Sequence, residues 1–189
     1  MVHYLNLFFV LTFAFNIHLP VFAGVFAGDV KHLDELQPCV DLFSDENEDD
    51  CCESFEVFKS VDEALEDCVK KDSVDLTCDD YSCVLNRIGI MKEGIIDEDA
   101  SKNYLKSLAD EYPEQIRLIH RVGALCLNGK YNDYDNSEES CPASNFYICI
   151  YTNTVLGCEK WKQTDECKKM SESAKACQSM LQSTKNQPK

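Results

Sequence analysis

The residues of this chain that offer the most chemistry are its twelve cysteines. All of them follow an apolar stretch at the N-terminus, and an even number of cysteines behind a secretion signal is typical of a disulfide framework rather than of reactive thiols. Zinc binding is disfavoured for the same reason, because cysteines in a secreted chain usually oxidise. We therefore expect six disulfides among Cys39, Cys51, Cys52, Cys68, Cys78, Cys83, Cys126, Cys141, Cys149, Cys158, Cys167 and Cys177.

Catalytic residue types are scarce. Two of the four histidines, His32 and His120, lie beyond residue 27, where the expected leader ends, and only His120 lies in the region expected to fold. A Ser-His or Cys-His hydrolase needs such a base, but His120 on a helix more often packs or faces solvent. The sequence contains no His-Glu-x-x-His motif, no nucleophile elbow and no glycine-rich phosphate loop. We expect no enzyme, no catalytic residue and no cofactor.

An acidic run contains the one pattern that resembles a cation site. Asp45, Asn47, Asp49 and Glu56 occupy positions one, three, five and twelve of an EF-hand-like loop. The sixth position of that loop needs glycine for its sharp turn and is Asp50 here. We interpret the run as an acidic surface loop and expect no metal.

The net charge of the chain disfavours some classes of binding partner. The formal net charge is −16 at pH 7. Such a balance repels phosphate backbones and anionic lipid surfaces, so nucleic acid is not an expected partner.

The N-terminus indicates secretion. Residues 5–15 are apolar, but the run is shorter than the ~20 residues of a membrane span. Small residues at Ala23 and Ala27 each suit signal peptidase, so we expect a signal peptide over 1–27 with cleavage after one of them. The remaining 28–189 fit one domain, and no later stretch is apolar enough to enter a membrane.

The elements expected to position these residues are helices. Apolar residues recur at three- and four-residue steps in most of the segments, with Gly94, Pro113 and the Asn128-Gly129 pair as boundaries. Segment 143–156 is rich in β-branched and aromatic residues, so a strand is the alternative there. The expected fold is a compact all-α bundle of about six helices braced by disulfides. The helices are expected over 53–71, 81–91, 97–111, 115–127, 143–156 and 164–181.

One stretch resembles a known family. Cys83 to Asp97, CVLNRIGIMKEGIID, resembles the segment that starts at the third core cysteine of insect odorant-binding proteins of the pheromone and general odorant-binding family. The resemblance covers roughly residues 55–158. In this family three residues separate the second and third core cysteines, and eight separate the fifth and sixth. Here eight residues separate Cys149 from Cys158, whereas four separate the cysteines at 78 and 83.

The resemblance implies a disulfide pattern. It assigns the six core cysteines as Cys52, Cys78, Cys83, Cys126, Cys149 and Cys158, with Cys51 as the alternative first member. The implied bridges are Cys52–Cys83, Cys78–Cys149 and Cys126–Cys158. The six further cysteines and the cysteine-bearing extension 159–189 resemble the Plus-C branch, although Glu159 stands where that branch usually has proline. The pairing of the other six cysteines stays open.

The resemblance also implies a function. Such a protein is a secreted carrier that binds small hydrophobic odorants or pheromones in an internal hydrophobic cavity and transports them through aqueous sensillar lymph. Its expected partners are apolar volatiles, with chemosensory receptors and a second copy of the chain as further candidates. Tyr147 or Tyr151 could orient a polar ligand head, and each cavity candidate could equally pack the core. The candidates are Phe58, Val61, Leu65, Leu85, Ile88, Met91, Leu105, Leu108, Ile119, Val122, Phe146, Tyr147, Ile150 and Tyr151.

Two other classes of function stay open. One is a salivary or reproductive-fluid protein on the same scaffold, which binds another protein and no volatile ligand. The other is a small secreted enzyme, against which the shortage of histidine argues. Uptake of apolar probes separates the carrier from the protein-binding factor.

Overall fold

A computed structural model of the chain describes residues 37–44, 51–69, 76–134 and 140–185. The expected signal peptide and most of the acidic run with its EF-hand-like spacing lie outside these residues. No helix within the described ranges is both long and apolar enough to cross a membrane.

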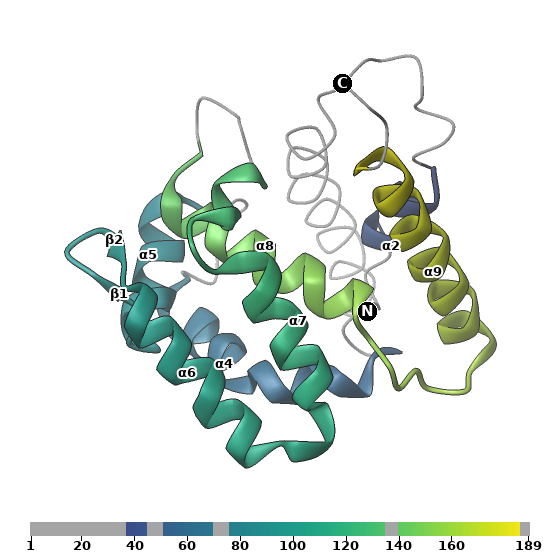
Figure 1. The fold of residues 1–189 in the computed structure, drawn as a ribbon, viewed down its shortest axis with the longest axis horizontal. Helices are drawn as coiled ribbons and strands as arrows, with labels where there is room; N and C mark the ends of the chain where they lie inside the picture. The colour runs from purple at the N-terminus through teal and green to yellow at the C-terminus, as the bar shows by residue number, and fades with distance from the viewer. Residues whose placement is uncertain (1–36, 45–50, 70–75, 135–139, 186–189) are drawn as a thin grey trace, which may run out of the picture.

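The described chain is almost entirely helical, which confirms the all-α prediction (Figure 1). The other elements are the 3₁₀ turns η2 (Glu53–Phe58), η3 (Pro113–Gln115) and η4 (Lys130–Asp133) and the strands β1 (Met91–Lys92) and β2 (Ile95–Ile96). The α-helices are α2 (Gln37–Ser44), α4 (Lys59–Cys68), α5 (Cys78–Arg87), α6 (Glu98–Glu111), α7 (Ile116–Cys126), α8 (Pro142–Leu156) and α9 (Asp165–Lys185). The segment with strand-like composition, 143–156, is helical as expected.

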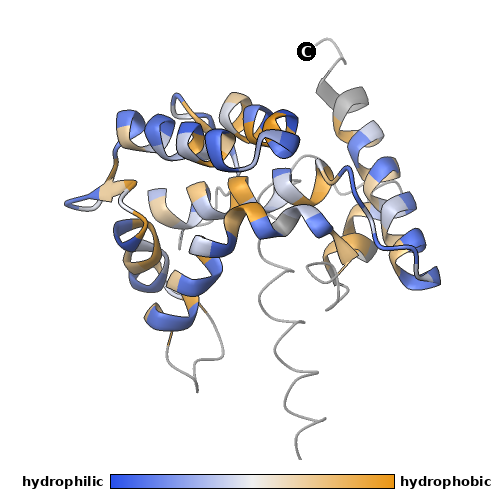
Figure 2. Ribbon diagram, turned by 90° about the horizontal axis from the view of Figure 1, so that it is seen from below, coloured by the Kyte–Doolittle hydropathy of each residue, from blue (hydrophilic) through white to orange (hydrophobic). Residues whose placement is uncertain are grey.

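Helix α8 is the centre of the fold. Twelve of its fifteen residues are buried, and a helix that is apolar on all sides requires cover on all sides. It contacts α5, α7 and α9, and Figure 1 shows it in the middle with α5 and α9 towards opposite sides. Hydrophobic residues gather on the inner sides of the helices (Figure 2).

The buried residues form two clusters that α8 joins. The larger one lies among α4, α5, α6, α7 and the first part of α8, and it includes Leu85, Ile119 and Phe146. The smaller one lies among α2, α9 and the last residues of α8, with Phe43 and Val155 at 2 % and 0 % exposure. The C-terminal extension is therefore packed on the fold through α9.

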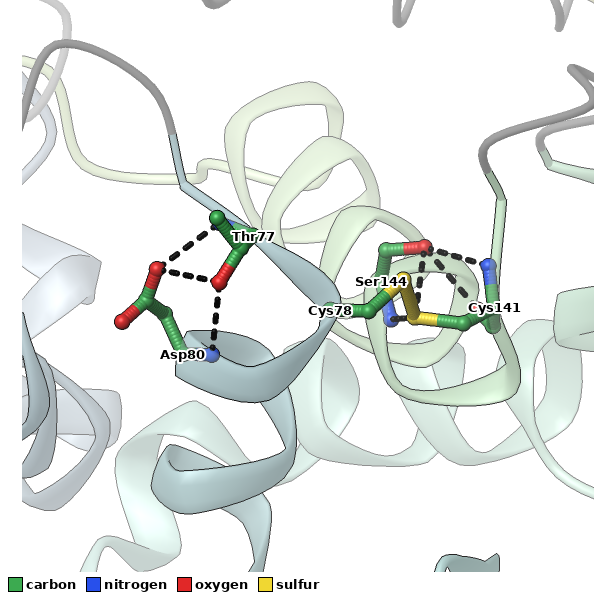
Figure 3. The surroundings of a disulfide bond; sticks show 5 residues. All are labelled: Thr77, Cys78, Asp80, Cys141 and Ser144. Atoms are coloured by element: carbon green, nitrogen blue, oxygen red, sulfur yellow. Dashed lines mark hydrogen bonds between the residues drawn. A yellow bond between two sulfur atoms is a disulfide. The ribbon is translucent and has the colours of Figure 1, made fainter.

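Local sequence signals start the helices at their observed positions. The side chain of Thr77 accepts a hydrogen bond from the Asp80 N–H, and the Asp80 carboxylate accepts one from the Thr77 N–H, so α5 begins with a capping box. Asp97 caps α6 by accepting from two backbone N–H groups. At the start of α8, the Ser144 hydroxyl accepts from the Cys141 N–H at 3.0 Å (Figure 3).

A short hairpin replaces the end of one expected helix. The segment 81–91 was expected to be helical throughout, but α5 ends at Arg87 and Met91 lies in β1. Glu93 and Gly94 both have positive φ, at 53° and 79°. A two-residue hairpin turn requires that conformation at both central positions. The prediction for Met91 was wrong because a two-residue strand is too short to show alternation.

All twelve cysteines are paired within the chain. Two helices of the larger cluster are joined to α8 at its start and its middle, by Cys78–Cys141 (Figure 3) and Cys126–Cys149. The six bridges are Cys39–Cys177, Cys51–Cys167, Cys52–Cys158, Cys68–Cys83, Cys78–Cys141 and Cys126–Cys149.

These pairs correct the bridges that the resemblance implies. Cys52–Cys83, Cys78–Cys149 and Cys126–Cys158 are all absent, because backbone packing fixes other neighbours. The residues just before η2 lie antiparallel to the segment beyond α8. Cys52 forms an isolated β-bridge with Trp161, and the Lys162 N–H donates to the Cys51 carbonyl at 2.9 Å. Cys52 therefore reaches Cys158 and not the cysteine of α5.

The order of the bridges along the chain has two parts. The inner six cysteines are crossed, first with third, second with fifth and fourth with sixth: Cys68, Cys78, Cys83, Cys126, Cys141 and Cys149. The outer six are nested, with sequence separations of 106, 116 and 138. The crossed set holds the larger cluster together, and the nested set joins α2 and the η2 segment to the C-terminal part.

Peptide mapping of the oxidised protein under non-reducing conditions tests this framework. We expect linked peptides for each inner pair, and partial reduction should separate the bridges of the adjacent Cys51 and Cys52. A peptide that links Cys78 to Cys149 would contradict the crossed order described above.

Candidate binding pocket

A small apolar pocket lies where η2, α4 and α5 meet α8. Its α8 wall consists of residues at three- and four-residue steps, which places them on one face of the helix. Phe58, Val61 and Asp62 face them from η2 and α4, and Leu85 from α5. The lining is Phe58, Val61, Asp62, Leu85, Tyr147, Ile150, Tyr151 and Thr154.

The pocket walls differ in how firmly they are held. Phe58, Val61, Leu85 and Ile150 are buried in the larger cluster. Disulfides Cys68–Cys83 and Cys78–Cys141 join α4 to α5 and α5 to α8. The two tyrosines of α8 are only half-buried, so core packing holds less of their side chains than of the other apolar lining residues.

An aromatic row runs along this side of α8. The rings of Tyr81 and Tyr147 lie 5.1 Å apart, and those of Tyr147 and Tyr151 are stacked at 6.4 Å. Tyr151 lies 6.4 Å from Phe43 of α2. Because aromatic pairs at these separations attract each other, the row connects the two clusters through the pocket wall.

The pocket is narrow in this conformation. The volume of the pocket is about 20 Å³. That is room for about one water molecule, whereas ligand pockets typically span about 300–1,000 Å³. A ligand of the size of a volatile ester therefore requires the tyrosine side chains to move.

The structure places six of the fourteen cavity candidates in this lining. The other eight lie in or against the larger core cluster: Met91, Leu105, Leu108, Ile119, Val122 and Phe146 are buried, and Leu65 and Ile88 are partly buried. Sequence reasoning missed Asp62, an exposed carboxylate, and Thr154, whose hydroxyl donates to the Ile150 carbonyl at 2.8 Å. Thr154 follows Tyr147 and Ile150 at helical spacing, so extending that pattern by one turn would have found it.

Other candidate chemistry lies away from this pocket. His120 is exposed on α7 and does not line it. In the part of the chain that the structure describes, no three His, Cys, Asp or Glu side chains are grouped as a metal site.

Comparison of the chain with protein-family models, curated proteins and solved structures finds no match. The six disulfides are typical of a protein that folds in an oxidising, extracellular compartment.

Two partly buried phenols report on the packing around α8 and α4. Tyr134 accepts a hydrogen bond from the Asn153 amide at 2.6 Å, and the Tyr104 hydroxyl lies 2.8 Å from the Ser60 hydroxyl. Burial is the main cause that raises the pKa of both phenols. The folded protein therefore keeps these protons to higher pH than the unfolded chain does.

This difference predicts a loss of stability in alkali. The contribution of Tyr134 is complete below its ordinary pKa of about 10 and is lost as the pH rises through its raised folded pKa. We expect the free energy of unfolding, measured in urea between about pH 9 and pH 11, to fall as tyrosinate absorbance appears. Tyr134→Phe should make the fall shallower, and an equally steep fall in that variant would contradict the assignment.

Proposed function

We propose that this protein is a secreted carrier of small hydrophobic odorants or pheromones, which it binds beside α8 and transports through an aqueous lymph to receptors. The observation that carries the proposal is the apolar pocket whose helices are joined by crossed disulfides. Such a site can open by side-chain movement while the helices around it stay in place.

The order of the disulfides supports the resemblance to insect odorant-binding proteins. The bridges that the resemblance implies join first to third, second to fifth and fourth to sixth core cysteine. The crossed inner bridges have that order when the core begins at Cys68 and ends at Cys149, an assignment that leaves seven residues, and not eight, between the fifth and sixth cysteines. The stretch CVLNRIGIMKEGIID spans the second half of α5, the hairpin and the cap of α6.

The energetics suit a weakly polar volatile. Each Å² of apolar ligand surface removed from water contributes about 25 cal/mol. Opening the pocket costs part of this gain, because Tyr147 and Tyr151 must leave their stacked arrangement. The tyrosine hydroxyls and the exposed Asp62 carboxylate would then orient a hydroxyl or carbonyl group of the ligand.

A protein-binding factor on the same scaffold is the second candidate. Ile95 at the β-hairpin is 70 % exposed, and Val40 and Ile116 are also exposed large apolar residues. An exposed isoleucine at a hairpin suits contact with another protein, although single exposed apolar residues are also ordinary.

Displacement of a fluorescent apolar probe tests the carrier function. We expect the oxidised protein to take up the probe saturably and to release it to volatile alcohols, esters and aldehydes according to their structure. Leu85→Ala should enlarge the pocket and change that ranking, at a cost of about 2–5 kcal/mol in stability.

Leu105→Ala is the matched control. It removes the same atoms from the same core cluster, at a residue outside the pocket lining. The control should keep the wild-type ranking of ligands. Two results would contradict the carrier function and favour the protein-binding factor. One is absence of probe uptake by correctly folded protein, and the other is an identical change of the ligand ranking in both variants.

A further inference from the structure

A second, polar cleft lies at the other end of α8. It is formed by one side of α7, the residues that follow α8, and α9. Its volume is about 340 Å³, at the lower end of the range for small-molecule sites. The lining is Arg117, Leu118, Arg121, Leu156, Gly157, Cys158, Glu159 and Gln178.

Arg121 is held in this cleft by packing. A Cβ placed on Gly157 would lie only 3.0 Å from the Arg121 Cδ and 2.7 Å from the Leu118 Cδ1, so the arginine stem lies close against the glycine. At its far end the guanidinium donates through Nη1 and Nη2 to the Gln178 amide oxygen at 2.6 and 3.1 Å, with the amide in the orientation that satisfies both groups. The guanidinium is therefore fixed between α7 and α9.

No carboxylate within the described ranges lies in ion-pair contact with Arg121. The Arg121 Nε is buried without a hydrogen bond. Burial lowers the pKa of the Arg121 guanidinium, which reflects the cost of holding the charge there. An unpaired, half-buried arginine is unexpected in a chain with a net charge of −16, where carboxylates are abundant.

Arg117 adds a second cation one helical turn away. It pairs with Glu159 at 2.8 Å, and its side chain is 80 % exposed. The cleft thus contains two guanidinium groups and one carboxylate. Leu118 and Leu156, which are both buried, supply an apolar wall beside these charges.

We propose that this cleft binds the carboxylate group of a small amphiphilic acid, with the guanidinium of Arg121 as its main partner and the leucine wall against its short alkyl chain. A guanidinium presents a fork of N–H donors that matches a carboxylate. The neutral amide of Gln178 accepts hydrogen bonds from the Arg121 guanidinium but does not neutralise its charge. A bound carboxylate would do both. The cleft shares no residue with the apolar pocket, so this inference goes beyond the proposed carrier function.

Calorimetric titration of the oxidised protein tests the proposal with three probes: hexanoate, hexanol and inorganic phosphate. We expect saturable binding of hexanoate, and binding at least about tenfold weaker for the other two, because hexanol lacks the charge and phosphate lacks the alkyl chain. Arg121→Gln should weaken hexanoate binding by about tenfold or more, since a hydrogen bond to a charged group contributes about 1.5–3 kcal/mol.

Arg87→Gln is the matched control. Arg87 is an exposed arginine of α5 that pairs with Asp67, away from the cleft, and its loss changes the net charge equally. This variant should bind hexanoate as the wild type does. Glu159→Gln should strengthen binding by up to about fivefold, because it frees Arg117 and removes a competing carboxylate.

Some results would overturn the proposal. These are unchanged affinity for hexanoate in Arg121→Gln, equal affinity for hexanol and hexanoate, or preference for phosphate. Should Arg121→Gln fail to fold by circular dichroism, the exposed Arg117→Gln and Glu159→Gln variants give the test, and opposite effects on hexanoate affinity are expected. Loss of apolar-probe uptake would count against the carrier function and leave this site unaffected.

Discussion

The constraint on which this fold depends is the burial of α8. Its sequence places apolar or small residues on every side, so no face of the helix can be left to water. Helices α5 and α7 cover its first part, and α9 covers its last residues. Disulfides fix the same helix at its start through Cys141, at its middle through Cys149 and just beyond its end through Cys158. These three bridges therefore reinforce an arrangement that burial of α8 already demands.

The two pockets have different chemistry because they lie at different parts of α8. Beside Tyr147 the helix faces η2, α4 and α5, whose inner residues are apolar, and the pocket between them is narrow and hydrophobic. Beyond Leu156 the helix has ended, and Gly157 gives room for the stem of Arg121 to pass. Polar groups from α7 and α9 then line a wider cleft. The middle of α8 thus lines a narrow apolar pocket, and its C-terminal end lines a wider polar cleft.

The sequence predicted α4, α5, α6 and α7 because their apolar residues recur with helical period over about ten positions. It did not predict α2, whose eight residues lie outside every expected helix. It failed at Met91, where the hairpin contains too few residues to show any period, although Gly94 was recognised as a boundary. Cysteine pairing could not be read from spacing, because Cys52 finds Cys158 only after the segments around Cys51 and Lys162 lie side by side. Six pocket residues were among the candidates because they share helix faces with the core. Arg121 was missed, since its role depends on Gly157 and Gln178, which lie far away in the sequence.

The proposed carrier function would require a rigid frame around an interior that can open, and the bridges supply the rigid frame. Cys68–Cys83 and Cys78–Cys141 join the helices around the apolar pocket. These bridges oppose any opening of the pocket that moves the helices apart. Rotation of a half-buried tyrosine is a cheaper way to create space, because it exposes little of the core. The narrowness of the pocket has an energetic reason. An empty apolar cavity large enough for an odorant would lack packing contacts and would destabilise the ligand-free protein. In the proposed carrier, Tyr147 and Tyr151 would occupy that space until a ligand of similar apolar surface replaced them.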